Sequence, residues 1–301
     1  MNKQLLSSRH IANKLDIFPI GLGAMPLSIL NRPLEKEALH VIETFLNAGG
    51  NFIDTANVYG LDDSDRGHNE RLIQKALNQF GYSDKVLVAT KGGATRPQGG
   101  WGLGEGHPTQ LRQLCEKSLL DLGIDAHSLY YLHGPDPRVP FADSLGELIN
   151  LKKAGKIKNI GIANVELDQV KQALELTEIA AVQNRCNPFC KGDFENGLIA
   201  FCKQNNIAYV PYCPLGGWGD HAKLSENILF TDLTKKYQVS SYVICLAWLL
   251  SKDTHIIPIP GMDKKEQIKT NFSAVSVFLN PDDIKKIDAF SNLYSPIHKE
   301  Q

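Results

Sequence analysis

Short apolar segments alternate with amphipathic helical segments along nearly the whole chain. Strand-like segments that recur with a helix between them are typical of a parallel sheet covered by helices. Eight such units in 301 residues fit a closed (β/α)8 TIM barrel better than an open doubly wound sheet. The segments expected as strands are 17–22, 52–54, 86–89, 128–132, 157–163, 180–182, 207–210 and 255–259.

The ends of the chain add further elements to this barrel. Residues 4–15 are expected to form an N-terminal β-hairpin that plugs one end, and extra helices from Lys264 and over 281–290 follow the last strand. The letters GLGAMP after the first strand do not match GxGxxG, which weakens the open-sheet alternative. Because no linker or low-complexity segment interrupts the pattern, we expect a single domain over residues 1–301.

The charge balance argues against a nucleic acid or a membrane surface as a partner. The chain carries 33 acidic and 32 basic side chains, and its net charge of -1 is not gathered into a basic block. The N-terminal letters MNKQLLSSRH lack a long apolar stretch, and the apolar run 242–250 is too short to span a bilayer. We therefore expect a cytoplasmic protein, as a monomer or a weak homodimer.

The six cysteines do not predict a disulfide framework or a metal centre. They form no CxxC pair, and several of them lie inside apolar segments, which is typical of reduced thiols. Cys186 and Cys190 are four residues apart, but Pro188 lies between them and no His/Cys pair follows. We expect no metal.

Polar and aromatic side chains follow the expected strands at the points where the strands end. Parallel strands of a barrel present their carboxyl ends at one mouth, so these side chains are expected to converge there. Taken singly, each has a structural explanation, such as capping a segment or packing under a loop. The residues concerned are Asp54, Tyr59, Lys91, His133, Asn164, Gln183 and Tyr212.

The combination of a phenol, an ammonium, a carboxylate and an imidazole suits proton transfer to an oxygen. A phenol normally ionises near pH 10, and a neighbouring ammonium lowers that pKa. Asp54 can supply the counter-charge that a buried Lys91 needs, and His133 can hydrogen-bond a substrate oxygen beside Tyr59. The set has no evident nucleophile, so its natural use is carbonyl reduction with a hydride from a cofactor.

The residues and their order resemble the aldo-keto reductase superfamily over essentially the whole chain. By that resemblance Asp54, Tyr59, Lys91 and His133 form the catalytic tetrad, with Tyr59 as general acid/base. The segments that carry the resemblance are NFIDTANVYG (51–60), VATKGG (88–93), YYLHGPDP (130–137), VQN (182–184), VPYCPLGG (210–217) and IPIPG (257–261).

The resemblance also implies a nicotinamide cofactor that is shared among several strand ends. Asn164 and Gln183 would contact the carboxamide, and Tyr212 would stack on the nicotinamide ring. The remaining contacts fall on Gly23, on Cys213, Leu215 and Gly217 along the pyrophosphate, and on Gly261, Asp263, Lys264, Gln267 and Asn271 at the adenosine end.

Two departures from the family pattern bear on the cofactor. Ala163 stands where the family often has serine, so one carboxamide hydrogen bond is in doubt. Asp263 and Lys264 stand where many relatives place a serine and an arginine against the 2′-phosphate of NADPH. Lys264 can pair with that phosphate as a point charge, whereas Asp263 would repel it. NADPH is therefore expected, with NADH as the alternative.

Three functions remain open at this point. The first is an NAD(P)H-dependent enzyme that reduces an aldehyde or ketone, and the second is a cofactor-binding sensor or regulatory subunit with little turnover. The third, a sugar- or phosphate-processing barrel, is disfavoured by the nicotinamide-contacting set. Trp101 and Trp218, in the long loops 92–107 and 216–227, are expected to contact a small-molecule carbonyl substrate.

Overall fold

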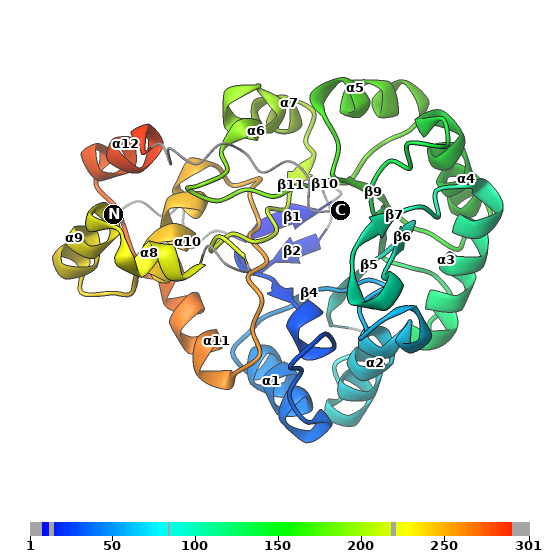
Figure 1. Cartoon of the computed structure of the whole chain (residues 1–301), viewed down its shortest axis with the longest axis horizontal. Coiled ribbons are helices and arrows are strands. Elements are labelled where there is room, and N and C mark those ends of the chain that lie inside the picture. Colours follow the sequence, from blue (N-terminus) through cyan, green and yellow to red (C-terminus); the bar gives the residue numbers. More distant parts are fainter. Residues whose placement is uncertain (1–7, 12–14, 84, 218–220, 291–301) are drawn as a thin grey trace.

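A computed structural model of the chain describes residues 8–11, 15–83, 85–217 and 221–290. Parallel strands lie at the centre and helices surround them (Figure 1). The order in the main sheet follows the chain, from one edge to the other, and confirms the expected barrel architecture. Its strands are β3 (Leu22–Gly23), β4 (Phe52–Asp54), β5 (Leu87–Gly92), β8 (Leu129–Leu132), β9 (Ile160–Ala163), β10 (Ala181–Gln183) and β11 (Ala208–Tyr209).

The segment expected as the eighth strand, 255–259, closes the barrel without forming a regular strand. On one side the Ile257 amide donates to the Tyr209 carbonyl of β11 at 2.9 Å. On the other side the Gly23 amide of β3 donates to the Pro260 carbonyl at 3.0 Å. Pro260, like the proline two positions earlier, has no amide hydrogen to return toward β3. The ladder on that side is therefore incomplete, although the barrel is closed.

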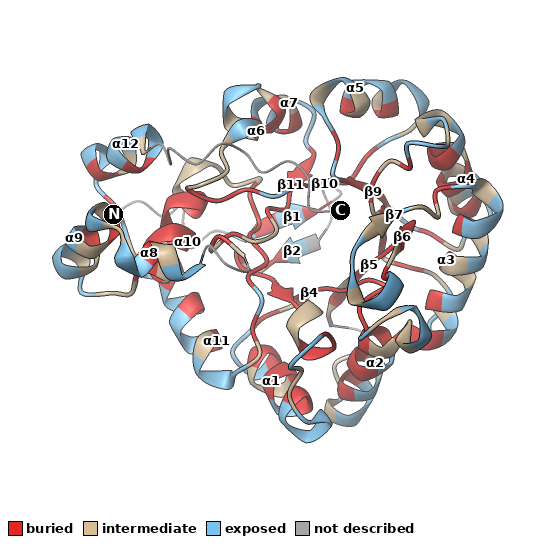
Figure 2. Ribbon diagram, viewed as in Figure 1, coloured by how far each residue is buried: buried red, intermediate tan, exposed pale blue. Residues whose placement is uncertain are grey.

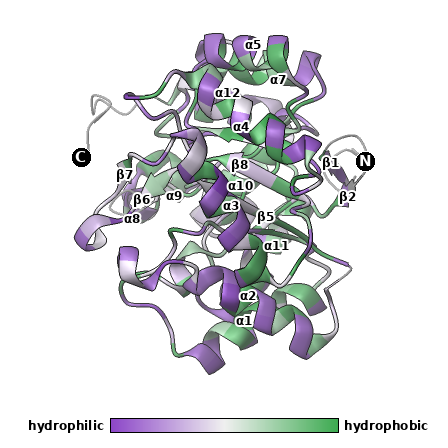
Figure 3. Cartoon of the chain, turned by 90° about the vertical axis from the view of Figure 1, so that its right-hand side faces the viewer, coloured by the Kyte–Doolittle hydropathy of each residue, from purple (hydrophilic) through white to green (hydrophobic). Residues whose placement is uncertain are grey.

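The expected N-terminal hairpin is present, and it covers one end of the barrel. Strands β1 (Arg9–Ile11) and β2 (Leu15–Ile17) pair antiparallel, and Ile11 and Ile17 pack in the same apolar cluster as Phe52 of β4. Residues 4–7 and 12–14, also expected in the hairpin, lie outside the described part of the chain. Ile17, which was expected in the first barrel strand, belongs to the hairpin instead. Figure 3 shows the hairpin at the opposite end from β6 (Ala94–Thr95) and β7 (Gly102–Leu103).

The helices bury the face that their apolar spacing predicts, as the red inner surfaces in Figure 2 show. In the first helix, for example, Ala38, Ile42 and Phe45 recur at helical intervals and all are buried. The helices are α1 (Glu35–Asn47), α2 (His68–Phe80), α3 (Pro108–Leu122), α4 (Phe141–Lys153), α5 (Leu167–Leu176), α6 (Gly192–Glu195), α7 (Leu198–Gln204), α8 (His221–Glu226), α9 (Ile228–Tyr237), α10 (Ser241–Lys252), α11 (Lys265–Phe272) and α12 (Pro281–Ala289).

Two helical boundaries differ from the sequence pattern. The sequence pattern of 193–204 predicts one helix, but Gly197 adopts a φ of 83° and separates α6 from α7. That left-handed conformation cannot continue a right-handed helix. The loop expected over 216–227 contains the short helix α8, which buries Leu224.

Two glycines offer a matched test of the packing inside the barrel. A Cβ added to Gly161 in β9 would lie 2.4 Å from the buried ring of Tyr131, whereas one added to Gly146 in α4 meets nothing within 4 Å. We expect Gly161→Ala to lower the free energy of unfolding by about 1–3 kcal/mol, because the ring must move. Gly146→Ala should raise it by about 0.5–1 kcal/mol, because alanine favours the helix. Urea unfolding measures both, and equal effects would contradict the packing described here.

Candidate active site

A lysine side chain lies fully buried at the mouth of the barrel, with three oxygen atoms around its ammonium group. Lys91 Nζ, from β5, donates to Asp54 Oδ1 at 2.6 Å, to the Thr55 carbonyl at 2.7 Å and to the Tyr59 hydroxyl at 3.1 Å. An ammonium can donate three hydrogen bonds, so this arrangement uses its full capacity. The structure thus brings together three of the four residues that the sequence singled out, and adds the backbone of Thr55.

The local chain geometry explains why these groups meet. Strand β4 ends at Asp54, which pairs in register with Ala89 of β5, so Lys91 emerges two residues beyond that pair. The chain then turns back, because the Tyr59 amide donates to the Ala56 carbonyl at 3.1 Å. Gly60 is required next, since a Cβ there would lie 2.6 Å from a backbone oxygen.

Burial and charge act in opposite directions on the ion pair. Burial raises the pKa of Asp54 and lowers the pKa of Lys91, while their mutual contact opposes both changes. Asp54 Oδ2 also accepts from Gln183 Nε2 at 2.8 Å, which further favours the carboxylate. With short hydrogen bonds at both oxygens and at the ammonium, we expect the pair to remain ionised.

The Tyr59 hydroxyl keeps its proton across neutral pH. Burial, the charge of Asp54 and the neighbouring Cys213 raise the pKa of Tyr59 well above its usual value. The sequence led us to expect a lowered pKa from the Lys91 ammonium, but in the structure burial outweighs that attraction. The group is therefore a hydrogen-bond and proton donor rather than a phenolate.

His133 completes the expected tetrad beside the tyrosine. It follows β8, and its ring centroid lies 6.0 Å from that of Tyr59, at an interplanar angle of 79°. Burial and the Lys91 charge lower the pKa of His133 well below its usual value, so the imidazole is neutral. Its Nδ1 atom is buried and has no hydrogen-bond partner among the described residues.

Two side-chain amides lie at the ends of the neighbouring strands β9 and β10. Asn164 has a φ of 55°, donates to the His133 carbonyl at 2.8 Å and accepts from the Tyr212 hydroxyl at 2.8 Å. The Gln183 amide donates to Asp54. A primary amide has two donors and an acceptor with two lone pairs, so both keep capacity for a further carboxamide.

The segment after β11 forms a tight turn near these amides. Cys213 has a φ of 48°, and its carbonyl accepts from Asn187 Nδ2 at 3.0 Å. Gly217 has a φ of 76°, and a Cβ there would lie 2.8 Å from the Cys213 sulfur. Leu215 lies within this turn, partly buried. Trp218, expected to contact substrate, lies outside the described residues.

The segment expected at the adenosine end runs from the closing segment into α11. Gly261 forms a parallel bridge with Gly23, at the edge where the barrel closes. Gln267 Oε1 accepts from the amides of Asp263 at 2.8 Å and Lys264 at 3.0 Å, and so caps the start of the helix. Asn271, one turn further along α11, is buried.

Trp101, expected to contact substrate, lies against Tyr59. The rings of Trp101 and Tyr59 are edge to face, with centroids 6.1 Å apart. Arg96 lies over the Trp101 ring, with its Cζ 4.3 Å from the ring centroid, and is itself 2% exposed. Sequence analysis missed Arg96, because its role depends on how the loop 92–107 folds.

Glu70 is a further buried acid, for which the sequence alone indicates no more than a part in ordering the loop after β4. It lies in the first turn of α2 and accepts from the Thr90 hydroxyl at 2.6 Å. Burial raises the pKa of Glu70 to about 7. Thr90 precedes Lys91 in β5, so Glu70 supports the strand that carries the lysine.

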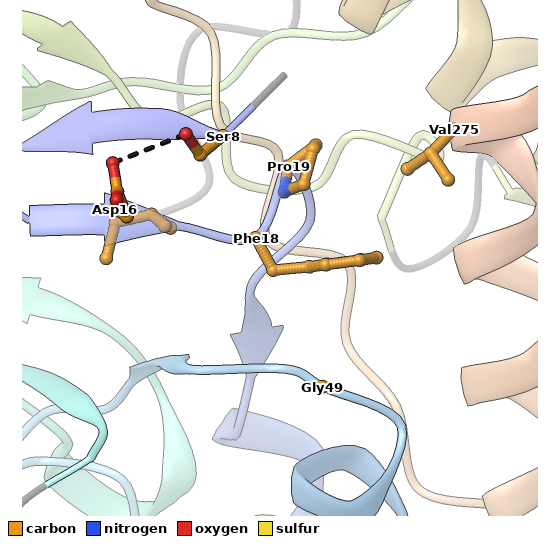
Figure 4. Close-up of a pocket in the computed structure, with 7 residues that line it drawn as sticks. Ser8, Asp16, Phe18, Pro19, Gly49 and Val275 are labelled. Carbon is orange, nitrogen blue, oxygen red and sulfur yellow. Dashed lines mark hydrogen bonds between the residues drawn. The ribbon is translucent and has the colours of Figure 1, made fainter. Parts of the chain in front are cut away.

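Two hollows lie away from the tetrad. One, of 210 Å³, lies beneath the hairpin and is lined by residues that include Phe18 and Val275 (Figure 4). The other, of 450 Å³, lies on the outer surface between α1, α2 and α3. Within the described residues no cluster of three or more histidine, cysteine or acidic side chains could hold a metal ion. No helix in that part of the chain is long and apolar enough to cross a membrane.

The raised pKa of Glu70 predicts a pH-dependent stability. The folded state holds a proton that the unfolded chain releases above its ordinary pKa near 4.5, so stability is lost as the pH rises through about 7. Glu70→Gln removes this loss. The wild type should lose about 3 kcal/mol of its free energy of unfolding between roughly pH 5 and roughly pH 9, and Glu70→Gln should not lose it. The difference between variant and wild type therefore grows by that amount.

Denaturant titrations at the two pH values measure this difference. Glu116→Gln is the control, because this exposed carboxylate has a pKa lowered by Lys156 and its effect should not grow over that range. A Glu70→Gln difference that stays constant with pH would contradict the buried, protonated state.

Comparisons with known proteins show which proteins the chain resembles. The sequence model of the Aldo/keto reductase family matches residues 19–292. The chain is 31% identical to Probable aldo-keto reductase 1 of Glycine max, over 90% of this chain and 85% of that protein. A thermostable aldo-keto reductase solved with the inhibitor epalrestat is 25% identical, with a TM-score of 0.80 over 93% of this chain and 98% of the other. An aldo/keto reductase of Klebsiella pneumoniae, solved with NADP and acetate, is 21% identical, with a TM-score of 0.78 over 94% of each chain.

Proposed function

The chain belongs to the aldo/keto reductase family of oxidoreductases, and on that premise we propose that it reduces an aldehyde or ketone to the alcohol with NADPH. The observation that carries the proposal is the 3.1 Å contact between the Lys91 ammonium and the Tyr59 hydroxyl, with Asp54 behind the lysine. This set can release a proton and stabilise the anion left behind. A binding protein without turnover would not need it.

Tyr59 acts as the general acid in the proposed reaction. A bound nicotinamide would supply the hydride for the carbonyl carbon, and negative charge would then develop on the carbonyl oxygen. The Tyr59 hydroxyl protonates that oxygen, and the resulting phenolate lies beside the Lys91 ammonium, which stabilises it. Solvent then returns a proton to Tyr59.

His133 orients the carbonyl. A neutral imidazole can donate one hydrogen bond, so it can polarise a carbonyl oxygen without competing with Tyr59 as an acid. Burial, helped by the Lys91 charge beside it, lowers the pKa of His133 and keeps the ring neutral. The hydrogen bond from Asn164 to the His133 carbonyl fixes the backbone there. Trp101, edge to face with Tyr59, would offer its indole to a small planar or apolar carbonyl compound.

The residues present fit a nicotinamide cofactor. Asn164 and Gln183 lie on adjacent strands, joined by a backbone hydrogen bond of 3.0 Å, and both amides have donors and acceptors to spare. A related protein from Klebsiella pneumoniae was solved with NADP, which supports the same choice here. Lys264 would hold the 2′-phosphate of NADPH.

The Tyr59→Phe variant tests the acid role. The ring is retained and only the proton donor is lost, so kcat for a reactive aldehyde should fall by about 10²–10⁴-fold. The Kd for NADPH should change less than about twofold, since the ring still packs against Trp101 and Lys91. Loss of NADPH absorbance measures turnover, and quenching of protein fluorescence measures binding. A wild type that binds NADPH but reduces nothing, with Tyr59→Phe unchanged, would favour a cofactor-binding sensor.

Lys264 offers a separate test of the cofactor. Lys264→Met removes one exposed charge, so the Kd for NADPH should rise by about three- to tenfold while that for NADH stays unchanged. Asp263→Asn should tighten NADPH binding, because it removes a repulsive carboxylate next to the same phosphate. Wild-type preference for NADH, with no effect of either variant on NADPH, would contradict NADPH as the cofactor.

A further inference from the structure

The third acceptor of the Lys91 ammonium is a backbone carbonyl, and its position depends on a side chain outside the tetrad. The Thr55 carbonyl accepts from Lys91 Nζ at 2.7 Å. The Thr55 amide donates to the Ala89 carbonyl at 2.8 Å, and its hydroxyl donates to Asn69 Oδ1 at 2.6 Å. Thr55 is therefore held at both its backbone and its side chain, with its carbonyl facing the lysine.

Asn69, in the first turn of α2, connects three separate segments of the mouth. Its Nδ2 donates to the Ala24 carbonyl at 2.8 Å and to the Ser28 hydroxyl oxygen at 2.7 Å, both in the loop after β3. Its backbone amide donates to the Tyr59 carbonyl at 3.3 Å. Asn69 is 0% exposed, so none of these bonds is exchanged with solvent. Both side-chain donors and the side-chain acceptor are used within the protein.

The position of Asn69 links it both to the proton donor, Tyr59, and to the ammonium of Lys91 beside that donor. It reaches Lys91 through Thr55, and it reaches Tyr59 through the backbone of that residue. Buried polar groups that are fully satisfied fix a single geometry, because any other geometry leaves a partner unpaired. Glu70, the next residue, faces Thr90 on the outer side of β5, so the two residues support neighbouring strands.

We propose that Asn69 is a positioning residue for the reaction: it fixes the Thr55 carbonyl as an acceptor of the Lys91 ammonium and holds the backbone of Tyr59 at the same time. The inference rests on the proposed carbonyl reduction. If the carbonyl turns away, the ammonium loses an acceptor and its pKa falls. Tyr59 then has a less stable cation beside its developing phenolate.

Thr55→Val is the sharpest test, because valine has the shape of threonine but cannot donate to Asn69. We expect kcat for an aldehyde to fall about tenfold. The alkaline limb of the pH–kcat profile should move about one pH unit lower, because the pKa of the Lys91 ammonium falls. Both changes correspond to the effect of one hydrogen bond to a charged group. KM and the Kd for NADPH should stay within about twofold. Thr55→Ser keeps the hydroxyl and should restore kcat to within about threefold of wild type.

Asn69→Asp and Asn159→Asp form a matched pair. Asn69→Asp removes the donors to Ala24 and Ser28, and it should lower kcat and Tm together. Asn159 donates to the Ser128 carbonyl at 2.8 Å just before β9, at the opposite end of the barrel. Asn159→Asp should lower Tm without changing kcat or its pH profile.

Hydrogen–deuterium exchange over residues 55–67 supplies a measurement that does not require turnover. Exchange there should rise in Thr55→Val and Asn69→Asp but not in Asn159→Asp. Variants that lower Tm alone, with wild-type kcat, pH profile and exchange over 55–67, would overturn the positioning role. A wild type without carbonyl reductase activity would contradict the proposed function. Exchange over 55–67 in Thr55→Val and Asn69→Asp would then test whether Asn69 holds this segment in place. Unchanged exchange overturns that role, and raised exchange supports it.

Discussion

The buried ammonium of Lys91 is the interaction on which the candidate site depends. A charge removed from water is tolerated only where hydrogen-bond acceptors and an opposite charge replace the solvent. Here these come from Asp54, Thr55 and Tyr59, which all follow the neighbouring strand. One of the acceptors that the buried ammonium requires is the phenol of Tyr59. The contact that stabilises the folded chain is therefore the same contact on which the proposed proton transfer depends.

The barrel makes this arrangement possible because it closes. The register between β4 and β5 sets how far Lys91 projects beyond Asp54. The side-chain amides of Asn164 and Gln183, at the ends of β9 and β10, lie at the same mouth. The hairpin covers the opposite end, where Ile11 and Ile17 pack in one apolar cluster with Phe52. Closure itself uses a segment with two prolines, Pro258 and Pro260. Their carbonyls accept from the amides of Gly21, just before β3, and of Gly23 in β3, but neither proline has an amide hydrogen to donate in return.

Much of this could be predicted from the sequence, because hydrophobic periodicity and strand-end residues follow simple rules. The alternation predicted the barrel, and Asp54, Tyr59 and Lys91 do meet. The role of Thr55 could not be predicted, since a backbone carbonyl leaves no signature in the side chain. The raised pKa of Tyr59 was also missed, because burial depends on tertiary packing rather than on which charges are nearby. The irregular closing segment could not be predicted either. Pro258 and Pro260 lack amide hydrogens, and this interrupts a ladder only if the neighbouring segment, here β3, lies on that side.

The measurement that tests the account most directly is the activity of a double variant, Asp54→Asn with Lys91→Met. It removes both charges with side chains of similar shape, so no unpaired charge is left buried. The account predicts a folded protein that binds NADPH with near wild-type affinity and reduces an aldehyde about 10³-fold more slowly, a loss typical of an impaired general acid. Near wild-type turnover would contradict it, because the buried cation would then have no part in the proton transfer.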